Sequence, residues 1–283
     1  MKKKFAAFGL LSALVLGLAA CGGGSDEKAT KESAGGKSGE DTTIIVGASP
    51  TPHAEILEEA KPLLKEKGFD LEIKVFDDYI LPNTALESKE LDANYFQHIP
   101  YFENAVEENN FDFVNAGKVH IELMALYSQQ LKDIKDLEEG ATVLTSNSET
   151  DWGRIITILQ DAGLVKVKDG VDLLTATFDD IAENPKNLKF KYDLDPGMMT
   201  SAYQNDEAAL IAINANFANG IGLSPKEDGV LVEKDNSPYA NIVAVRTGDE
   251  KTEKIKALMD VLHSEEITSF IEEKWSGTIT PIQ

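Results

Sequence analysis

Cysteine, arginine and histidine are scarce in this 283-residue chain, which has one cysteine, two arginines and four histidines. A single cysteine excludes an internal disulfide. The histidines are His53, His98, His120 and His263, and none has a closely spaced partner as in HxxxH. This spacing argues against a metal receptor, so we predict no metal site and no cofactor.

Sequence motifs of common enzymes are absent as well. The chain has no GxSxG, no phosphate-binding GxxxxGK and no HExxH. Its abundant carboxylates would allow a hydrolase in principle, but nothing in the sequence positions a pair of them. The sequence therefore predicts a protein that is not an enzyme.

Basic residues are few, because 27 lysines and arginines stand against 49 aspartates and glutamates, a formal net charge of −22. A chain of this charge is not attracted to nucleic acid or to anionic lipid. We therefore expect no nucleic-acid partner, and any membrane attachment must come from a covalent lipid.

The N-terminus carries a targeting pattern. Three lysines precede an apolar run over residues 5–20, which is shorter than the roughly 20 residues of a membrane-spanning helix. Residues 1–20 are therefore predicted to be a signal peptide. The run ends in Leu-Ala-Ala-Cys, which resembles a bacterial lipobox and predicts acylation of Cys21. The alternative is an ordinary secretory signal or membrane anchor with a cysteine there by chance.

Residues 22–43 contain glycine, serine and charged side chains but no large apolar side chain. Such a segment cannot bury enough surface to order itself. We interpret residues 21–43 as the lipidated cysteine and a flexible tether, which would hold the following domain on the order of 25 Å from a membrane. This arrangement favours a lipid-anchored receptor that works beside a membrane partner.

Strand and helix patterns alternate after the tether. A strand at 43–48 precedes a helix that Thr51 can cap and whose Ile56, Leu57, Ala60 and Leu64 face inward. A second strand is predicted at 71–76, and a third at 91–96 runs into a helix opened by Pro100. This βαβα order predicts an α/β fold with a mainly parallel sheet flanked by helices.

Two extended segments, 118–128 and 239–246, are interpreted as crossings between two lobes joined by hinge strands. They predict lobe I over 44–124 plus 243–283 and lobe II over 125–242. Within lobe II we predict strands at 142–144, 188–192 and 208–213 and helices near 153–162 and 178–184. After the return crossing, helices are predicted at 250–262 and 265–275. Hinged lobes commonly close around a ligand.

Aromatic residues gather in one place, since four of the 21 in the chain lie between Tyr95 and Phe102. The corner between strand and helix there would lie at the carboxyl end of a strand, where α/β folds bind ligands. Phe96, His98 and Tyr101 are therefore candidates for a pocket wall. The alternative is a packed core corner.

Polar candidates follow in the second half. Arg154 begins a predicted helix and could hold a carboxylate with two parallel hydrogen bonds; the alternative is a surface arginine paired with Asp151 or Glu149. Asn214 ends an apolar strand and offers both a donor and an acceptor to an amino acid. For Asn216 the expected role is instead to cap the following helix.

Several stretches resemble the methionine-binding lipoproteins of the NlpA family, the solute-binding components of ABC importers. LDANYFQHIPYF at 91–102 resembles the signature LDANFFQHxPYL, and VHIELM at 119–124 matches VHIEPM. FDDY with Pro-Asn at 76–83 resembles FxDYxxPN, INANFA at 213–218 resembles INxNYA, and SPYAN at 237–241 matches SPYxN. In NSETDWGRI at 147–155, three residues match the segment NDPTNxxRAL: Asn147, Thr150 and Arg154.

The resemblance implies a two-lobed fold of the type II periplasmic-binding-protein class. It implies that Arg154 clamps an amino acid carboxylate, and that Tyr79 joins the aromatic wall. The implied ligand-binding residues are Tyr79, Phe96, His98, Tyr101, Arg154, Asn214 and Asn241, and for Asn241 the alternative is a turn asparagine. His120 is expected to be a hinge residue, or to support the residues that contact the ligand, rather than to bind the ligand itself.

The resemblance has two weak places. Ser148, Glu149, Asp151 and Trp152 depart from the arginine segment, and the indole of Trp152 could narrow the pocket. The stretch from Leu194 to Gln204 replaces an acidic, glutamine-containing segment of the family, so no contact is carried over from it.

The resemblance implies a lipid-anchored receptor on the extracytoplasmic face of the cell membrane. It would capture methionine and deliver it to the permease and ATPase subunits of an ABC importer. One alternative is a receptor for a methionine-containing dipeptide or another amino acid. Another is a surface adhesin or an enzyme on the same scaffold.

Overall fold

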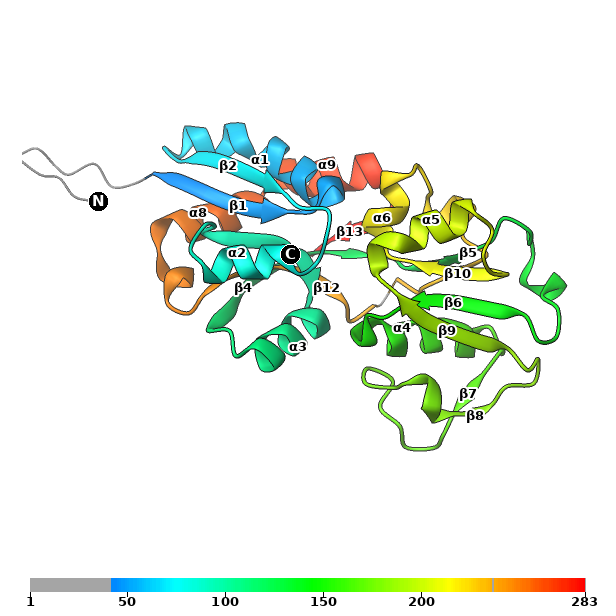
Figure 1. Cartoon of the computed structure of the whole chain (residues 1–283). Helices are drawn as coiled ribbons and strands as arrows, with labels where there is room; N and C mark the ends of the chain where they lie inside the picture. The colour runs from blue at the N-terminus through cyan, green and yellow to red at the C-terminus, as the bar shows by residue number, and fades with distance from the viewer. Residues whose placement is uncertain (1–41, 236, 283) are drawn as a thin grey trace, which may run out of the picture. The chain divides into compact units, whose positions relative to one another are not determined.

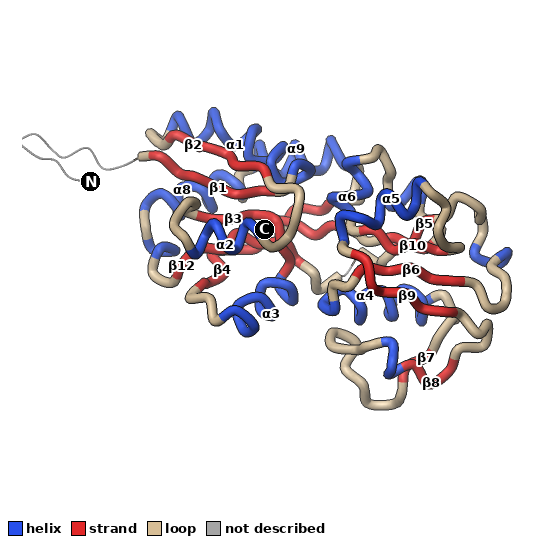
Figure 2. The backbone as a smooth tube through the Cα atoms, viewed as in Figure 1, coloured by secondary structure: helices blue, strands red, loops and turns tan. Residues whose placement is uncertain are grey.

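The computed structural model describes residues 42–235 and 237–282 (Figure 1). The predicted signal peptide, Cys21 and the tether up to residue 41 lie outside the described residues. The described chain builds two separate mixed sheets, each with helices on both faces, and a small two-stranded antiparallel sheet (Figure 2). None of the described helices combines the length and apolar character that a membrane span requires.

The first sheet has six strands in the order β13-β4-β12-β3-β1-β2. Strand β1 runs parallel to β2 and β3, whereas β12 is antiparallel to β3 and β4, and β13 is antiparallel to β4. The bounds are Thr43–Ala48 for β1, Asp70–Val75 for β2, Ala93–His98 for β3, Phe113–Glu122 for β4, Ala240–Arg246 for β12 and Ile279–Pro281 for β13. The predicted parallel βαβα series is present, but the sheet as a whole is mixed because the strands of the C-terminal return run antiparallel.

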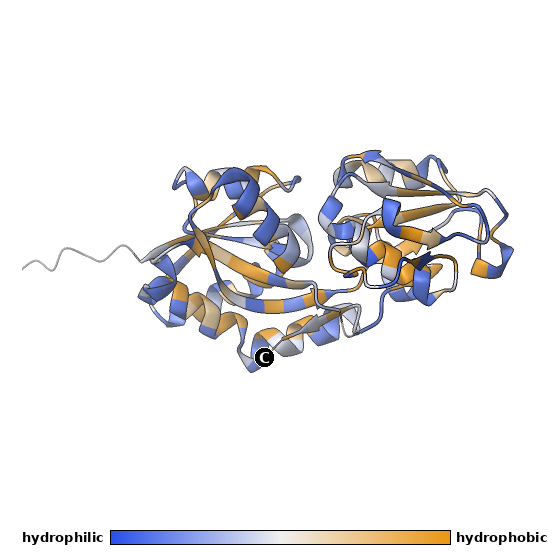
Figure 3. Cartoon of the chain, turned by 90° about the horizontal axis from the view of Figure 1, so that it is seen from below, coloured by the Kyte–Doolittle hydropathy of each residue, from blue (hydrophilic) through white to orange (hydrophobic). Residues whose placement is uncertain are grey.

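Amphipathic helices cover the two faces of this sheet. One face packs on α1 (Glu55–Glu66), α8 (Glu253–Leu262) and α9 (Glu265–Trp275), and the other packs on α2 (Leu81–Glu87) and α3 (Ile99–Asn109). Apolar residues follow the strands and the helix faces turned toward them (Figure 3). The four residues of α1 predicted to face inward are all fully buried.

The second sheet has five strands in the order β11-β5-β10-β6-β9. Strand β6 is parallel to β10 and β9, and β5 is antiparallel to β10 and β11. The strands are β5 (Ala125–Tyr127), β6 (Thr142–Ser146), β9 (Lys189–Leu194), β10 (Leu210–Ile213) and β11 (Leu231–Val232). Helix α4 (Glu149–Asp161) packs on one face, and α5 (Met199–Gln204) and α6 (Ala215–Gly220) pack on the other. A further short helix, α7 (Pro225–Asp228), precedes β11.

The chain passes from the first sheet to the second between Glu122 and Ala125, inside the segment predicted to cross. It returns between Val232 and Ala240, because β12 already pairs with β4 from its first residue and with β3 from its second. The predicted return segment is thus a strand of the first sheet, and the passage precedes it. The division into lobes at 124/125 and 242/243 stays a prediction.

Two local predictions need correction. Thr51 has the extended backbone of a helix start and Pro52 follows it, but its side chain makes no cap hydrogen bond among the described residues, and α1 itself begins at Glu55 after an irregular turn. The helix predicted near 178–184 is one turn followed by β8 (Ile181–Glu183), which pairs with β7 (Lys166–Val167). Pairing with β7 takes the backbone groups that a longer helix would use.

Candidate ligand-binding cavity

A cavity lies where the carboxyl ends of strands from the two sheets face one another. About 400 Å³ between its lining residues is free of protein atoms, open solvent at its mouth included, and the space that the centre of a water molecule can occupy is about 30 Å³. All seven residues predicted to bind a ligand line it: Tyr79, Phe96, His98, Tyr101, Arg154, Asn214 and Asn241. The sequence therefore selects residues that the fold brings together, although their part in binding stays a prediction.

The corner between β3 and α3 places the first group. Strand β3 ends at His98, two residues later than predicted, and His98 caps α3 by accepting a hydrogen bond at Nδ1 from the backbone N–H of Tyr101 over 3.2 Å. Pro100 lies in the first turn, where its missing N–H costs nothing. The imidazole Nε2 is left to reach across to Asp151.

Three rings form an aromatic wall, which we define as Tyr79, Phe96 and Tyr101. Their centroids lie 5.8–6.0 Å apart. The Tyr101 hydroxyl donates to the Tyr79 carbonyl over 2.8 Å, and the Tyr79 hydroxyl donates to Asn216 Oδ1 over 2.6 Å. Burial raises the pKa of Tyr101 to about 12, helped by nearby carboxylates, so this phenol stays a neutral donor.

The Tyr79–Asn216 bond links an element next to the first sheet with helix α6 on the second. Phe217 follows Asn216 and places its ring 5.2 Å from that of Tyr79. Asn216 does not cap the helix as predicted, because it lies within α6 and its side-chain oxygen accepts from Tyr79.

Asp151 is a buried carboxylate in the first turn of α4, with 1% of its surface exposed. Its Oδ1 lies 3.1 Å from His98 Nε2, and its Oδ2 accepts from Asn214 Nδ2 over 3.0 Å. Burial alone would raise the pKa of Asp151, but the hydrogen bond from His98, together with Arg154 and Asn214, holds it below its usual value. Asp151 is therefore ionised at neutral pH.

Arg154 is buried too, so it is not the surface arginine of the alternative interpretation. Its Nε donates to Glu233 Oε2 over 2.8 Å, and its Nη2 donates to the same oxygen and to the Glu122 backbone oxygen. The guanidinium carbon also lies 4.7 Å from the ring centre of Tyr239. Arg154 thus makes two hydrogen bonds to Glu233 rather than keeping both for a ligand. Of its three guanidinium nitrogens, only Nη1 makes no hydrogen bond to the described residues.

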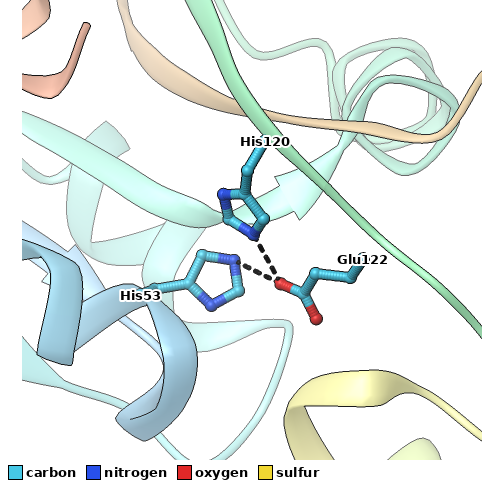
Figure 4. A group of neighbouring side chains, drawn as sticks. All are labelled: His53, His120 and Glu122. Carbon is cyan, nitrogen blue, oxygen red and sulfur yellow. Dashed lines mark hydrogen bonds and ion pairs between the residues drawn. The ribbon is translucent and has the colours of Figure 1, made fainter. Parts of the chain in front are cut away.

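Glu122 ends β4 beside two imidazoles (Figure 4). His120 Nε2 lies 2.9 Å and His53 Nε2 lies 3.2 Å from the same oxygen, Glu122 Oε1. His120 Nδ1 bonds to the Tyr95 hydroxyl, and His53 Nε2 is also 3.0 Å from Asn241 Oδ1. His120 thus lies behind Glu122 and does not line the cavity.

His53, His120 and Glu122 can hold one another by hydrogen bonds without a metal ion between them. Burial lowers the pKa of His53 to about 4, despite the opposing effect of Glu122, so the ring is neutral at pH 7. Burial would raise the pKa of Glu122, but His53, His120 and Arg154 hold it below its usual value. With a proton on each Nε2, both imidazoles donate to the carboxylate.

The ligand atoms of His53, His120 and Glu122 lie within 4.8 Å of one another and could hold a metal ion. The sequence spacing gave no sign of this group, because its members come from distant parts of the chain. Hydrogen bonds to the Glu122 carboxylate account for both Nε2 atoms. Of the ring nitrogens of His53 and His120, only His53 Nδ1 has no partner among the described residues.

Sequence reasoning missed several cavity residues: His53, Gln97, Glu122, Asp151 and Ala215. The sequence named Asp151 only as a departure from the family segment and as a surface partner of Arg154 in the alternative interpretation, and Glu122 only as part of VHIELM. Trp152, in contrast, does not line the cavity. Its ring packs 4.8 Å from that of Tyr192 and its N–H donates to the Ser146 oxygen, so the expected narrowing does not occur.

A larger opening adjoins the cavity and shares Tyr79 and Tyr101 with it. From the divergent stretch 194–204, Asp195 and Pro196 border this outer opening, and no residue of the stretch lines the inner cavity. The departure of this stretch from the family pattern therefore does not alter the inner lining.

Comparison with known proteins defines the class of the protein. Residues 44–283 match the model of the NlpA lipoprotein family. The chain is 47% identical over 285 residues to the methionine-binding lipoprotein MetQ of Bacillus subtilis (strain 168), covering 100% of this chain and 99% of that protein. It is 35% identical over 278 residues to the D-methionine-binding lipoprotein MetQ of Escherichia coli (strain K12), covering 98% of both.

Solved structures of similar proteins point to the same class. A pheromone cOB1 precursor lipoprotein from Enterococcus faecalis V583 has a TM-score of 0.83 at 53% identity, covering 85% of this chain and all of that one. A nutrient-binding protein from Burkholderia cenocepacia bound to methionine has a TM-score of 0.80 at 34% identity, with 85% and 100% covered. A periplasmic substrate-binding protein of an ABC transporter from Coxiella burnetii has a TM-score of 0.79 at 34% identity, with 84% and 100% covered.

The chain therefore belongs to the NlpA lipoprotein family. This is a family of solute-binding lipoproteins and not of enzymes, and membership implies lipid-anchored association with a membrane. The predicted α/β fold of the periplasmic substrate-binding proteins is confirmed.

Proposed function

We propose that this protein captures methionine in the cavity and delivers it to the permease and ATPase subunits of an ABC importer. In this proposal Cys21 carries the lipid anchor on the extracytoplasmic face of the membrane, and residues 44–124 plus 243–283 close against residues 125–242. The observation that carries the proposal is the polarity of the cavity: acceptors and donors remain for the two ends of an α-amino acid.

Three side chains supply acceptors. Glu122 Oε1 faces two imidazoles, and its Oε2 receives no hydrogen bond from the described residues. Asn214 uses its amide nitrogen on Asp151, so its oxygen remains available. Asp151 keeps further lone pairs after its two hydrogen bonds. Together these oxygens suit an ammonium group.

Two side chains supply donors. Arg154 keeps Nη1 after binding Glu233 and the Glu122 backbone oxygen. Asn241 engages its oxygen with His53 Nε2, so its amide nitrogen remains available. These donors suit a carboxylate, although with fewer hydrogen bonds from Arg154 than a two-bond clamp would give.

The aromatic wall would contact the ligand side chain. A thioether sulfur near a ring contributes about 0.3–1.5 kcal/mol, which biases such a wall toward methionine. A side chain branched at Cβ fits poorly against rings, and a second carboxylate would be buried without a partner at a cost of several kcal/mol. The names of the B. subtilis relative and the methionine-bound B. cenocepacia protein support this ligand, and the C. burnetii protein supports the transport role.

Mass spectrometry of protein purified without added ligand tests the ligand, and bound methionine is the expected result. After stripping, methionine at a thousand times its Kd should stabilise the fold by about 4.1 kcal/mol and raise the Tm by roughly 8–16 °C. Leucine, isoleucine and glutamate should raise it far less. A shift with a dipeptide or another amino acid but not with methionine would move the assignment to that ligand, and no shift in a full panel would exclude a receptor for these compounds.

The anchor is tested separately by Cys21→Ala. The variant should leave the detergent phase in detergent partitioning, because Cys21 is the only cysteine that can carry the lipid. A variant that still partitions like the parent would exclude Cys21 as the anchor.

A further inference from the structure

The charges around the cavity do not balance. Arg154 is the one arginine or lysine in its lining, and the carboxylate of Glu233 already neutralises it. Glu122 and Asp151 remain as two further buried carboxylates. A lining with this balance attracts a cation more strongly than it attracts an anion.

The histidines of the lining do not supply the missing positive charge. His53 is kept neutral by burial at pH 7. His98 accepts a hydrogen bond from the Tyr101 N–H at Nδ1, which requires a lone pair there, while its Nε2 faces Asp151. Both rings therefore serve as neutral donors, and they leave the charge of the carboxylates in place.

Asp151 is one of the two buried carboxylates that no positive charge in the lining balances. It stands where the segment NDPTNxxRAL has its second asparagine, so this chain carries a carboxylate in place of an amide. Its two oxygens fix the direction of the neighbouring hydrogen bonds, because His98 and Asn214 both donate to it. Asn214 must then present its oxygen, an acceptor, to the ligand.

We propose that Asp151 makes the free ammonium group of the ligand indispensable and the charge on its carboxyl end dispensable. The inference rests on the proposed function and extends it to a ligand class: α-amino compounds with a thioether side chain, including those whose carboxyl group is blocked as a neutral amide. The oxygen of such an amide still accepts from Arg154 Nη1 and Asn241. Only the attraction between Arg154 and a full negative charge on the ligand is lost, and the ion pair of Arg154 with Glu233 has already weakened that attraction.

Three probes and titration calorimetry on the stripped full-length protein test this inference: L-methionine, L-methioninamide and N-acetyl-L-methionine. The amide is expected to bind within about tenfold of methionine, and the N-acetyl compound at least a thousandfold more weakly. Equal loss for both blocked compounds, or a greater loss for the amide, would overturn the inference. These measurements need no variant, so they stand even if a substitution in the cavity disturbs the fold.

Asp151→Asn restores the amide of the family segment and identifies the residue responsible. The ratio of the Kd for methioninamide to that for methionine should rise at least tenfold. The matched control is Glu149→Gln, which removes the same charge from the same helical turn at an exposed position. The ratio should change less than twofold there, because water screens an exposed charge.

An unchanged ratio in Asp151→Asn, or an equal change in both variants, would show that Asp151 is not the cause. The proposed function fails separately. If stripped protein with a normal melting transition binds neither methionine nor its amide, the methionine assignment falls and the inference falls with it. If methionine binds but the probes do not discriminate as stated, the function stands and only the inference is wrong.

Discussion

The two sides of the cavity are built in different ways. On the side of the first sheet, the aromatic wall and His98 come mostly from one strand and the helix that follows it, β3 and α3. On the side of the second sheet, Asp151, Arg154 and Asn214 come from the start of α4 and the end of β10, and Glu233 joins them from the return segment. The aromatic wall and His98 are thus mostly local, although Glu122, His53 and Asn241 add a carboxylate and polar groups to the first side. The second side is charged and assembled from distant parts of the chain.

The difference assigns separate tasks to the two sides. Rings at about 6 Å from one another offer a surface for a ligand side chain. Buried ions and amides offer directed hydrogen bonds for the ammonium and carboxyl groups that all amino acids share. Substitutions on the charged side should therefore change stability and the binding of every amino acid, and those on the wall should change the choice among them.

The largest effect is expected on the charged side. Arg154→Ala leaves the Glu233 carboxylate buried without its partner, which should lower the free energy of unfolding by about 3–5 kcal/mol. Urea denaturation measures this loss, and calorimetry should show methionine affinity at least tenfold lower, about 1.4 kcal/mol. The control is Lys234→Ala, which breaks the exposed Lys234–Asp161 pair between the same two segments and should cost under about 1 kcal/mol. Equal losses in both variants would contradict the buried pairing.

The next effect concerns the pH dependence of stability and comes from His53 in the cavity lining. His53 has its pKa lowered to about 4 by burial, whereas in the unfolded chain it titrates near 6.5. Only the unfolded chain gains a proton between these values, so stability should fall as pH drops from 6.5 to 4, by about 3 kcal/mol from this residue. Glu122, whose pKa is depressed, adds a loss in the same direction as it becomes protonated at lower pH.

Urea denaturation at pH 7, 5 and 4 checks this dependence. His53→Gln should remove most of the loss between pH 6.5 and 4, since glutamine keeps an N–H donor but does not titrate. His263→Gln is the control, because that imidazole is exposed. The interpretation is wrong if the parent and His53→Gln lose the same stability over this range.

A smaller effect on methionine affinity is expected for a substitution in the aromatic wall than for one on the charged side. Tyr79→Phe keeps the ring but removes the hydroxyl that donates to Asn216 across the cavity. The lost hydrogen bond should lower methionine affinity by about 1 kcal/mol, roughly fivefold. Tyr192→Phe, on an exposed ring of the second sheet, should leave the affinity unchanged. Calorimetry compares the two, and equal affinities would show that the Tyr79–Asn216 bond does not contribute to binding.

The smallest effect is expected at Trp152. Trp152→Phe should change the methionine Kd less than twofold, because the indole packs on Phe178 and Tyr192 outside the cavity. A tenfold change in calorimetry would mean that this residue reaches the ligand after all, and it would blur the distinction between the two sides.

The sequence alone was sufficient for the elements and for the residues of the aromatic corner. Periodicity located β1 and α9 with the bounds that the structure shows, and Ser264 explains the sharp start of α9, since its hydroxyl accepts from Ile267 N–H. Local patterns succeed where the determining contacts are local. They fail near 178–184, where pairing with a distant strand, β7, overrides the local pattern.

The candidate site divides along the same line. Seven lining residues could be named from motifs, because each motif is a short run whose members lie close in the chain. Only the tertiary structure decided that Arg154 forms an ion pair with Glu233. It also decided that Asp151 accepts hydrogen bonds from His98 and Asn214, and that Glu122 lies beside His53. Strand ends from two sheets must face one another before these partners meet. Burial then fixes which atoms carry protons, because a buried polar group without a partner costs about 1–3 kcal/mol.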